Sequence, residues 1–201
     1  MNEQAKAALH TIDEKAAYFT AISDAVWDDP ELSLKEFHAA ALYKNALREL
    51  GFSVQENLCG IETAFSGSFG AGRPVIGILG EFDALSGLSQ QSGAAAPQSV
   101  TPGGNGHGCG HNLLGAGSLA AAAAVKEYLA MSGKPGTVVF FGCPGEEGGV
   151  PIAICYPKVF PDKCPPVLCP PDICFYSLSK STVYSFLFVF PRSRFINFIN
   201  R

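Results

Sequence analysis

The sequence predicts an α/β fold whose sheet contains parallel strands. Two apolar runs, residues 75–80 and 137–142, have the composition of strands that are buried on both faces of a sheet. Between them, an alanine- and leucine-rich segment begins at Asn112, a common N-cap residue, and ends before Gly133 and Pro135, which indicates a helix. Strand, helix and strand in this order form the unit from which parallel sheets are built.

The residues before these strands predict two helices and two short strands. Apolar side chains recur at spacings of three and four over residues 3–28 and again over 30–50, which is the pattern of amphipathic helices. Gly51 follows the second segment, where a helix end favours a glycine. Residues 52–54 and 64–69 are predicted to be short strands around a turn.

The composition indicates a globular protein of one or at most two domains. Of its 201 residues, 47% are hydrophobic and 16% are charged, which is too apolar for a disordered chain. The net charge of −4 provides no basic surface for nucleic acid. No apolar run approaches the roughly 20 residues that span a bilayer, and charged residues interrupt the start of the chain. We therefore expect no membrane association, no secretory signal and a reducing, cytoplasmic location.

The composition changes abruptly after Gly149. All 22 glycines lie at or before this residue, whereas eight of the 14 prolines lie after it. An even spread of glycines would leave the last quarter of the chain without any only about once in a thousand cases. We therefore divide the chain into residues 1–149, which belong to a folded domain, and residues 150–201, an unrelated tail that is not expected to form a domain. Translation of non-coding or out-of-frame sequence is the simplest origin of such a tail.

Acidic residues follow both predicted central strands. Glu81 and Asp83 come at the end of the first strand, and Glu146 and Glu147 come shortly after the second. In parallel α/β sheets, ligands bind beyond the carboxyl ends of the strands. We therefore expect the two acidic pairs to meet at one edge of the sheet.

A glycine-rich loop, residues 86–111, supplies softer ligands. His107, Cys109 and His111 alternate with glycines, and side chains two residues apart in an extended loop share one side, so Cys109 converges with His107 or with His111. Thiolate and imidazole suit Zn²⁺ or another first-row metal. Of two adjacent glutamates, one can bind such a metal while the other acts as a general base toward water.

Other roles for these residues stay open at this point. Cys109 precedes a predicted helix N-terminus that would lower its pKa, as in a cysteine nucleophile paired with a histidine. That arrangement leaves Glu146 and Glu147 without a role. Asp83 is either an ordinary residue at a strand end or the partner that holds a histidine ligand.

Three segments together resemble the amidohydrolase branch of the M20 metallopeptidase family: GEFDAL at 80–85, GHGCGHN at 106–112 and GCPGEEGG at 142–149. Residues 87–91 and 99–102 further resemble one particular member of this branch. The similarity covers nearly all of residues 10–149 and does not continue into the tail.

This resemblance implies the N-terminal part of a mixed, partly parallel α/β catalytic domain of the zinc-peptidase type, incomplete here and without the family's inserted dimerisation domain. It implies metal ligands at Cys109, His111 and Glu147 and a general base at Glu146. Asp83 matches the family's catalytic aspartate near the metals. Two divalent metals, Zn or Mn, would serve the intact site.

The implied reaction is the metal-dependent hydrolysis of a small-molecule amide, between an acyl or aryl group and an amino acid, by homo- or hetero-oligomers of the intact family. The tail contains no histidine that would complete a two-metal site, so the 201-residue chain is itself expected to be inactive. One alternative is a non-catalytic fragment that binds a partner. A third hypothesis is a cysteine-dependent hydrolase.

Overall fold

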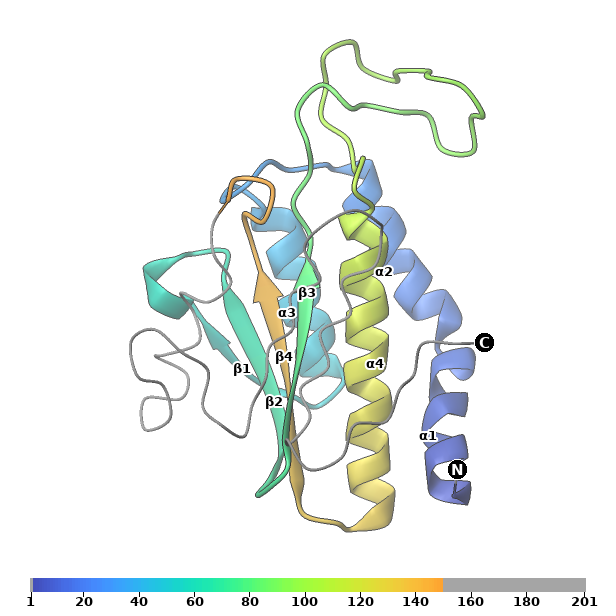
Figure 1. Cartoon of the computed structure of the whole chain (residues 1–201), viewed down its shortest axis with the longest axis vertical. Coiled ribbons are helices and arrows are strands. Elements are labelled where there is room, and N and C mark those ends of the chain that lie inside the picture. The colour runs from blue at the N-terminus through green and yellow to red at the C-terminus, as the bar shows by residue number, and fades with distance from the viewer. Residues whose placement is uncertain (1, 150–201) are drawn as a thin grey trace.

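The computed structural model describes residues 2–149, and the predicted tail at 150–201 lies outside the described residues. In the described part, one sheet has the strand order β1-β2-β4-β3, with β1 at Ser53–Glu56, β2 at Phe65–Ala71, β3 at Val75–Glu81 and β4 at Gly136–Cys143. β3 and β4 are parallel, whereas β2 is antiparallel to both β1 and β4. The predicted α/β class with a mixed, partly parallel sheet is confirmed (Figure 1).

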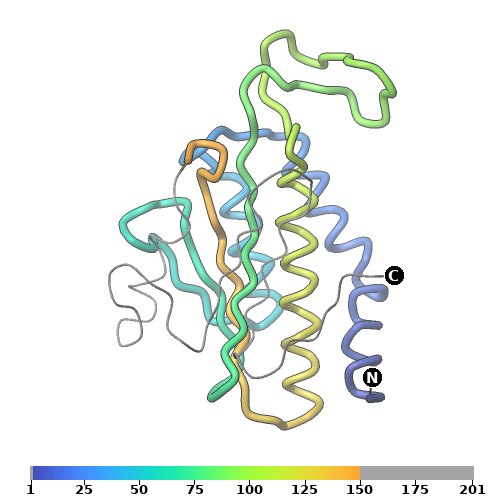
Figure 2. Tube along the Cα trace, in the orientation of Figure 1, coloured from blue at the N-terminus to red at the C-terminus, as the bar shows by residue number. Residues whose placement is uncertain are grey.

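Four α-helices accompany this sheet: α1 (Glu3–Glu14), α2 (Ala16–Asp28), α3 (Phe37–Glu49) and α4 (His111–Ser132); a short 3-10 helix lies at Leu58–Gly60. α4 is the crossover between β3 and β4, as predicted. α3 and α4 pack on the sheet, and α1 and α2 pack against α4 (Figure 1). The segment between β3 and α4 projects beyond the edge of the sheet (Figure 2).

The core between the helices and the sheet is centred on four aromatic rings. Each of these residues has 0% exposure, and the ring centroids of neighbouring pairs are 5.6 to 6.2 Å apart: Tyr43, Phe65, Phe82 and Phe140. Aromatic pairs at this separation stabilise a fold beyond the effect of area burial alone. Phe82 directly follows β3, so the core reaches the end of the strand where acidic residues were predicted to meet.

The two central strands differ in burial. β4 is buried at every position from Val138 to Cys143, which confirms the prediction for that strand. β3 is only half-buried at residues 75–77, because it is the last strand of the described sheet.

Two predicted helices have the wrong boundaries. The single helix predicted over residues 3–28 breaks at Lys15, where φ of −103° and ψ of 14° separate α1 from α2. The helix predicted over 30–50 begins only at Phe37. Leu34 has a positive φ of 63°, which no α-helix accommodates, and residues 31–36 are not helical.

The predicted N-cap of α4 is also wrong. The helix begins at His111, after Gly110 with φ of 75°. Asn112 lies inside the first turn and is buried, and its side-chain amide donates a hydrogen bond to Ser23 Oγ in α2 at 3.1 Å. This bond ties the start of α4 to the helix packed beside it.

α4 is the one described helix that is long and apolar enough, by length and composition, to cross a membrane. This is weak support for a span, because the core helix of a folded domain passes the same test. Ten residues of α4 are buried, and the helix contacts both central strands as well as α1 and α2. The expectation of no membrane association therefore stays a prediction.

Gly115 allows α4 to lie very close to β3. A Cβ atom at this position would overlap the Tyr43 hydroxyl and lie 2.7 Å from the carbonyl oxygen of Glu81. Because His111 is one helical turn earlier, this close approach sets how near its side chain comes to the end of β3.

We predict that Gly115→Ala lowers the free energy of unfolding by about 1–3 kcal/mol, because the added methyl group overpacks the contact between α4 and β3. The matched control is Gly117→Ala on the same helix, where nothing lies within 4 Å of the added atom. Alanine should there raise the stability by up to about 1 kcal/mol through helix propensity. Urea denaturation followed by circular dichroism measures both changes, and equal effects of the two variants would contradict the close-approach argument.

Candidate metal centre

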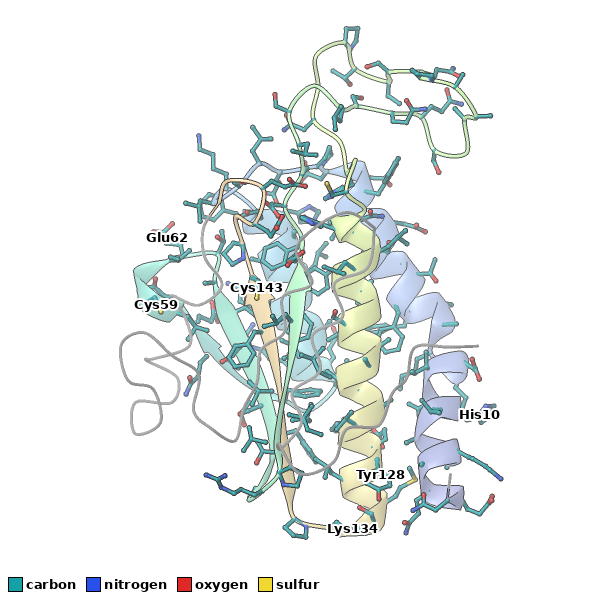
Figure 3. The ribbon with its side chains drawn as sticks, in the orientation of Figure 1. His10, Cys59, Glu62, Tyr128, Lys134 and Cys143 are labelled. Carbon is teal, nitrogen blue, oxygen red and sulfur yellow. The ribbon has the colours of Figure 1, made fainter. Side chains whose placement is uncertain are left out.

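The carboxyl ends of β3 and β4 lie side by side, with Glu81 paired in register with Cys143. Cys143 marks this end of β4 in Figure 3. Residues 144–149, here called the glutamate loop, follow at this edge, and α4 begins there as well. The prediction that the acidic residues after both strands meet at one edge is confirmed, because both groups lie within 4.0 Å of the His111 side chain.

The imidazole of His111 is buried among these acidic side chains. Its Nδ1 lies 2.9 Å from Asp83 Oδ1 and donates the hydrogen bond, because an ionised carboxylate only accepts. Its Nε2 lies 3.3 Å from Glu81 Oε2, 3.8 Å from Glu146 Oε2 and 4.0 Å from Glu147 Oε1. Asp83 therefore orients the ring so that Nε2 faces three carboxylates.

Asp83 also connects the ends of the two strands. Its Oδ2 accepts hydrogen bonds from Ser33 Oγ at 2.8 Å and from the backbone N–H of Glu147 at 2.9 Å. Burial alone would raise the pKa of Asp83, but the hydrogen bonds from His111, Ser33 and Glu147 lower the pKa below its usual value. Of the two roles open for Asp83, the geometry matches the partner that holds a histidine.

Burial and charge shift the pKa values of the groups around His111. Burial and the neighbouring carboxylates raise the pKa of Glu81 to about 7, although the charge of His111 opposes this. Burial would lower the pKa of His111, but the hydrogen bond to Asp83 and the charges of Glu81 and Glu147 raise it to about 9. The cluster thus favours a positive charge at its centre.

Cys109 lies exposed in the loop just before α4, near the carboxylate of Glu147. The neighbouring carboxylate of Glu147, partial burial and the surrounding negative charge raise the pKa of Cys109 to about 11. The prediction that the helix N-terminus lowers this pKa is therefore wrong, because the adjacent carboxylates outweigh the helix dipole. A protonated thiol is a poor nucleophile, so the raised pKa of Cys109 speaks against the cysteine-dependent hydrolase.

His107 does not join the cluster. Its Nε2 lies 3.0 Å from the backbone oxygen of Val26, to which it donates, and its buried ring lies against Trp27 with centroids 6.5 Å apart. Of the two histidines that could converge with Cys109, the structure therefore brings His111 to the acidic residues and directs His107 toward α2.

The clustered side chains fit a divalent cation. Ligand atoms of Glu81, His111 and Glu146 all lie within 4.8 Å of one another. Glu147 Oε1 is buried and has no hydrogen-bond partner among the described residues. A buried carboxylate oxygen without a partner is costly, and a cation would satisfy it. Imidazole, thiolate and carboxylate together form a donor set that Zn²⁺ and similar metals bind.

The structure brings together four of the five predicted site residues, Asp83, His111, Glu146 and Glu147, and it places Cys109 near Glu147. Their individual roles stay predictions. The structure also brings Glu81 into the cluster, a residue that was expected at this edge but not as a ligand or a base. A signal for Glu81 was present, since it is the first acidic residue after the apolar run of β3. The contact of Ser33 with Asp83 was not predictable, because residues 30–36 were expected to be helical.

Comparison with known proteins agrees with the three motifs. Residues 77–154 match the family model for peptidase family M20/M25/M40. The chain is 58% identical over 131 residues to one of the subunits of p-aminobenzoyl-glutamate hydrolase from Escherichia coli (strain K12), covering 65% of this chain and 27% of that protein. That protein is the member of the branch that residues 87–91 and 99–102 resemble. The human Xaa-Arg dipeptidase is 32% identical over 155 residues, covering 69% of this chain and 31% of its own.

Solved structures share the fold of the described residues. A putative aminohydrolase from methicillin-resistant Staphylococcus aureus matches with a TM-score of 0.56 at 24% identity, over 72% of this chain and 35% of its own. The Bacillus subtilis YXEP protein, described as a dinuclear metal-binding peptidase from the M20 family, matches with a TM-score of 0.51 at 26% identity, over 66% of this chain and 36% of its own. The chain thus spans about a third of the length of these proteins, and its motifs, residues 77–154 and the fold of its described residues are similar to those of the M20/M25/M40 family of peptidases.

Proposed function

We propose that the described residues contribute the first part of the metal site of an amidohydrolase that cleaves N-acyl or N-aroyl amino acids, with substrates similar to aminobenzoyl-glutamate. The observation that carries this proposal is the convergence of His111 Nε2 and three glutamate carboxylates at the ends of two parallel strands. The similarity to the Escherichia coli hydrolase supports the substrate class.

In this proposal, Cys109, His111 and Glu147 are metal ligands of a site that holds two Zn²⁺ or Mn²⁺ ions. The thiol of Cys109 lies near the carboxylate of Glu147, so the loss of the thiol proton leaves two anionic ligands beside His111. The dinuclear metal binding described for the YXEP protein supports the same stoichiometry here. A bound divalent cation supplies Lewis-acid polarisation of the scissile carbonyl group.

Glu146 is the proposed general base. Its side chain is 45% exposed, whereas that of Glu147 is 17% exposed, so Glu146 is the glutamate of the pair that can reach water and substrate. Glu146 takes a proton from the water that adds to the amide carbon. It then delivers this proton to the departing amino nitrogen, so the bond between the carbonyl carbon and that nitrogen breaks without a net change in protons.

The setting of the reaction is part of the same proposal. A metal-binding thiolate must not be oxidised, and a reducing compartment favours this state, which supports a cytoplasmic location. The Escherichia coli relative is named as a subunit, which supports assembly with a homologous or different chain. Nucleic acid and membranes are not proposed as partners.

Metal binding by the 201-residue chain tests the ligand assignment. Cys109→Ser and His111→Ala should each weaken Co²⁺ binding by at least roughly 10- to 100-fold, because each substitution removes a proposed metal ligand. Glu146→Gln should leave the affinity near that of the parent chain. Isothermal titration and the absorption of a cobalt–thiolate bond measure these effects.

The matched control is His38→Ala, which removes a histidine whose Nδ1 also lies 2.9 Å from an aspartate, Asp29, but on the surface. This variant should bind Co²⁺ like the parent chain. If Glu146→Gln weakened binding as much as His111→Ala, Glu146 would be a ligand and its assignment as a base would be wrong.

Activity is tested in a chimera in which residues 10–149 replace the matching segment of the Escherichia coli protein. The chimera should hydrolyse aminobenzoyl-glutamate, whereas its Glu146→Gln variant should lose at least about 100-fold in kcat while it retains metal, because a positioned base is lost. Product release followed by absorbance measures the rates. A chimera that binds metal and folds but has no activity would instead favour the non-catalytic, partner-binding hypothesis.

A further inference from the structure

The segment that joins α2 to α3 contacts every loop of the metal centre. We call residues 30–36 the 30–36 bend. The backbone oxygen of Glu31 accepts the N–H of Ala84 at 2.8 Å, and Ser33 donates to Asp83, both just after β3. The amide of Asn105, in the loop that leads to Cys109, donates to the backbone oxygen of Pro30 at 2.9 Å. The bend therefore links the loops that approach the site from different parts of the chain.

Glu36 links the same bend to the glutamate loop. Its side chain has 0% exposure. Its Oε1 accepts hydrogen bonds from the backbone N–H of Leu34 at 2.8 Å and from the backbone N–H of Gly145 at 2.9 Å. Gly145 directly precedes Glu146 and Glu147, and the contact joins residues 109 positions apart in the chain.

The capping of α3 explains why Glu36 is available for this contact. Glu36 is the N-cap residue of α3, but its side chain makes no hydrogen bond to the helix. Glu31 instead accepts the first helical N–H groups, those of His38 at 3.0 Å and Ala39 at 2.9 Å. Burial raises the pKa of Glu36, and the N–H groups of Leu34 and Gly145 oppose this shift through Oε1, whereas Oε2 has no hydrogen-bond partner among the described residues.

Two hydrogen bonds from the described part of the chain anchor the glutamate loop near its centre. The N–H of Gly145 donates to Glu36, and the N–H of Glu147 donates to Asp83. Glu146 lies between these anchors, and the N–H of Gly149 closes a turn onto its backbone oxygen at 2.9 Å. Among residues 2–149, loss of the first anchor would leave the hydrogen bond between Glu147 and Asp83 to hold the backbone of residues 145–147, so this segment could pivot about Glu147.

We propose that Glu36 is a positioning residue for the metal centre: by accepting the N–H of Gly145, it holds the glutamate loop so that Glu146 and Glu147 face His111. The claim that Glu36 holds the glutamate loop depends only on these hydrogen bonds. The consequence for metal binding and hydrolysis rests on the proposed function.

The test compares two substitutions of Glu36 that separate the length of the side chain from its charge. Glu36→Gln keeps an oxygen acceptor at the same reach but has no charge, whereas Glu36→Asp keeps the charge but is one methylene shorter. Glu31→Asp is the matched control, because it shortens the glutamate that caps α3 without touching the glutamate loop. All variants are made in the full 201-residue chain.

The first measurement is amide hydrogen exchange of Gly145 in the metal-free chain, followed by NMR. Glu36→Asp should speed this exchange at least roughly tenfold, because the N–H loses its acceptor, whereas Glu36→Gln and Glu31→Asp should leave it near the parent rate. Equal exchange of Gly145 in all four proteins would overturn the proposed contact. This measurement needs no metal, so it judges Glu36 even if the proposed function fails.

The second measurement is Co²⁺ affinity. Glu36→Asp should weaken it about 10- to 100-fold, as for other groups that orient metal ligands, and Glu36→Gln should restore most of it. A weaker affinity for Glu36→Gln than for Glu36→Asp would show that charge matters rather than positioning, and would overturn the proposal. An equal loss in Glu31→Asp would reduce the role of Glu36 to the general stability of the bend. A parent chain that does not bind Co²⁺ would contradict the proposed function. The hydrogen exchange of Gly145 would then be the measurement that tests whether Glu36 holds the glutamate loop.

Discussion

The parallel pairing of β3 and β4 is the constraint on which the rest of the site depends. It places Glu81 in register with Cys143, so that the loops after the two strands emerge at the same edge. α4 must then return across the sheet, and Gly115 lets the helix pack close enough to bring His111 within 3.3 Å of Glu81. His111 and Glu147, which are 36 positions apart in the chain, therefore meet because of the sheet topology.

Charge is the second principle of the site. Four carboxylates surround one imidazole. Burial and then the neighbouring carboxylates raise the pKa of Glu81, and, despite burial, the hydrogen bond to Asp83 and the surrounding carboxylates raise the pKa of His111. Hydrogen bonds to Asp83 keep that group ionised and fixed, whereas Glu147 Oε1 has no hydrogen-bond partner among residues 2–149. The clustered carboxylates repel one another at this edge, and a bound metal would reduce this repulsion.

The sequence was sufficient for the central unit of the fold and for the place of the site, because apolar runs followed by acidic residues are local patterns. It was insufficient for the 30–36 bend. Leu34 continues the apolar spacing of a helix, and only its positive φ shows the turn. The role of Glu36 depends on Gly145, far along the chain, and the pKa of Cys109 depends on Glu147 from another loop. Such effects arise from tertiary contacts, which the spacing of apolar residues in the sequence does not reveal.

The central claim is that this edge holds a metal through Cys109, His111 and carboxylate oxygen. X-ray absorption at the zinc edge, on the 201-residue chain loaded with Zn²⁺, tests it most directly. The account predicts one sulfur neighbour at about 2.3 Å together with nitrogen and oxygen neighbours at about 2.0–2.2 Å, and loss of the sulfur signal in Cys109→Ser. A zinc shell of nitrogen and oxygen alone in the parent chain, or a sulfur signal that survives Cys109→Ser, would contradict it.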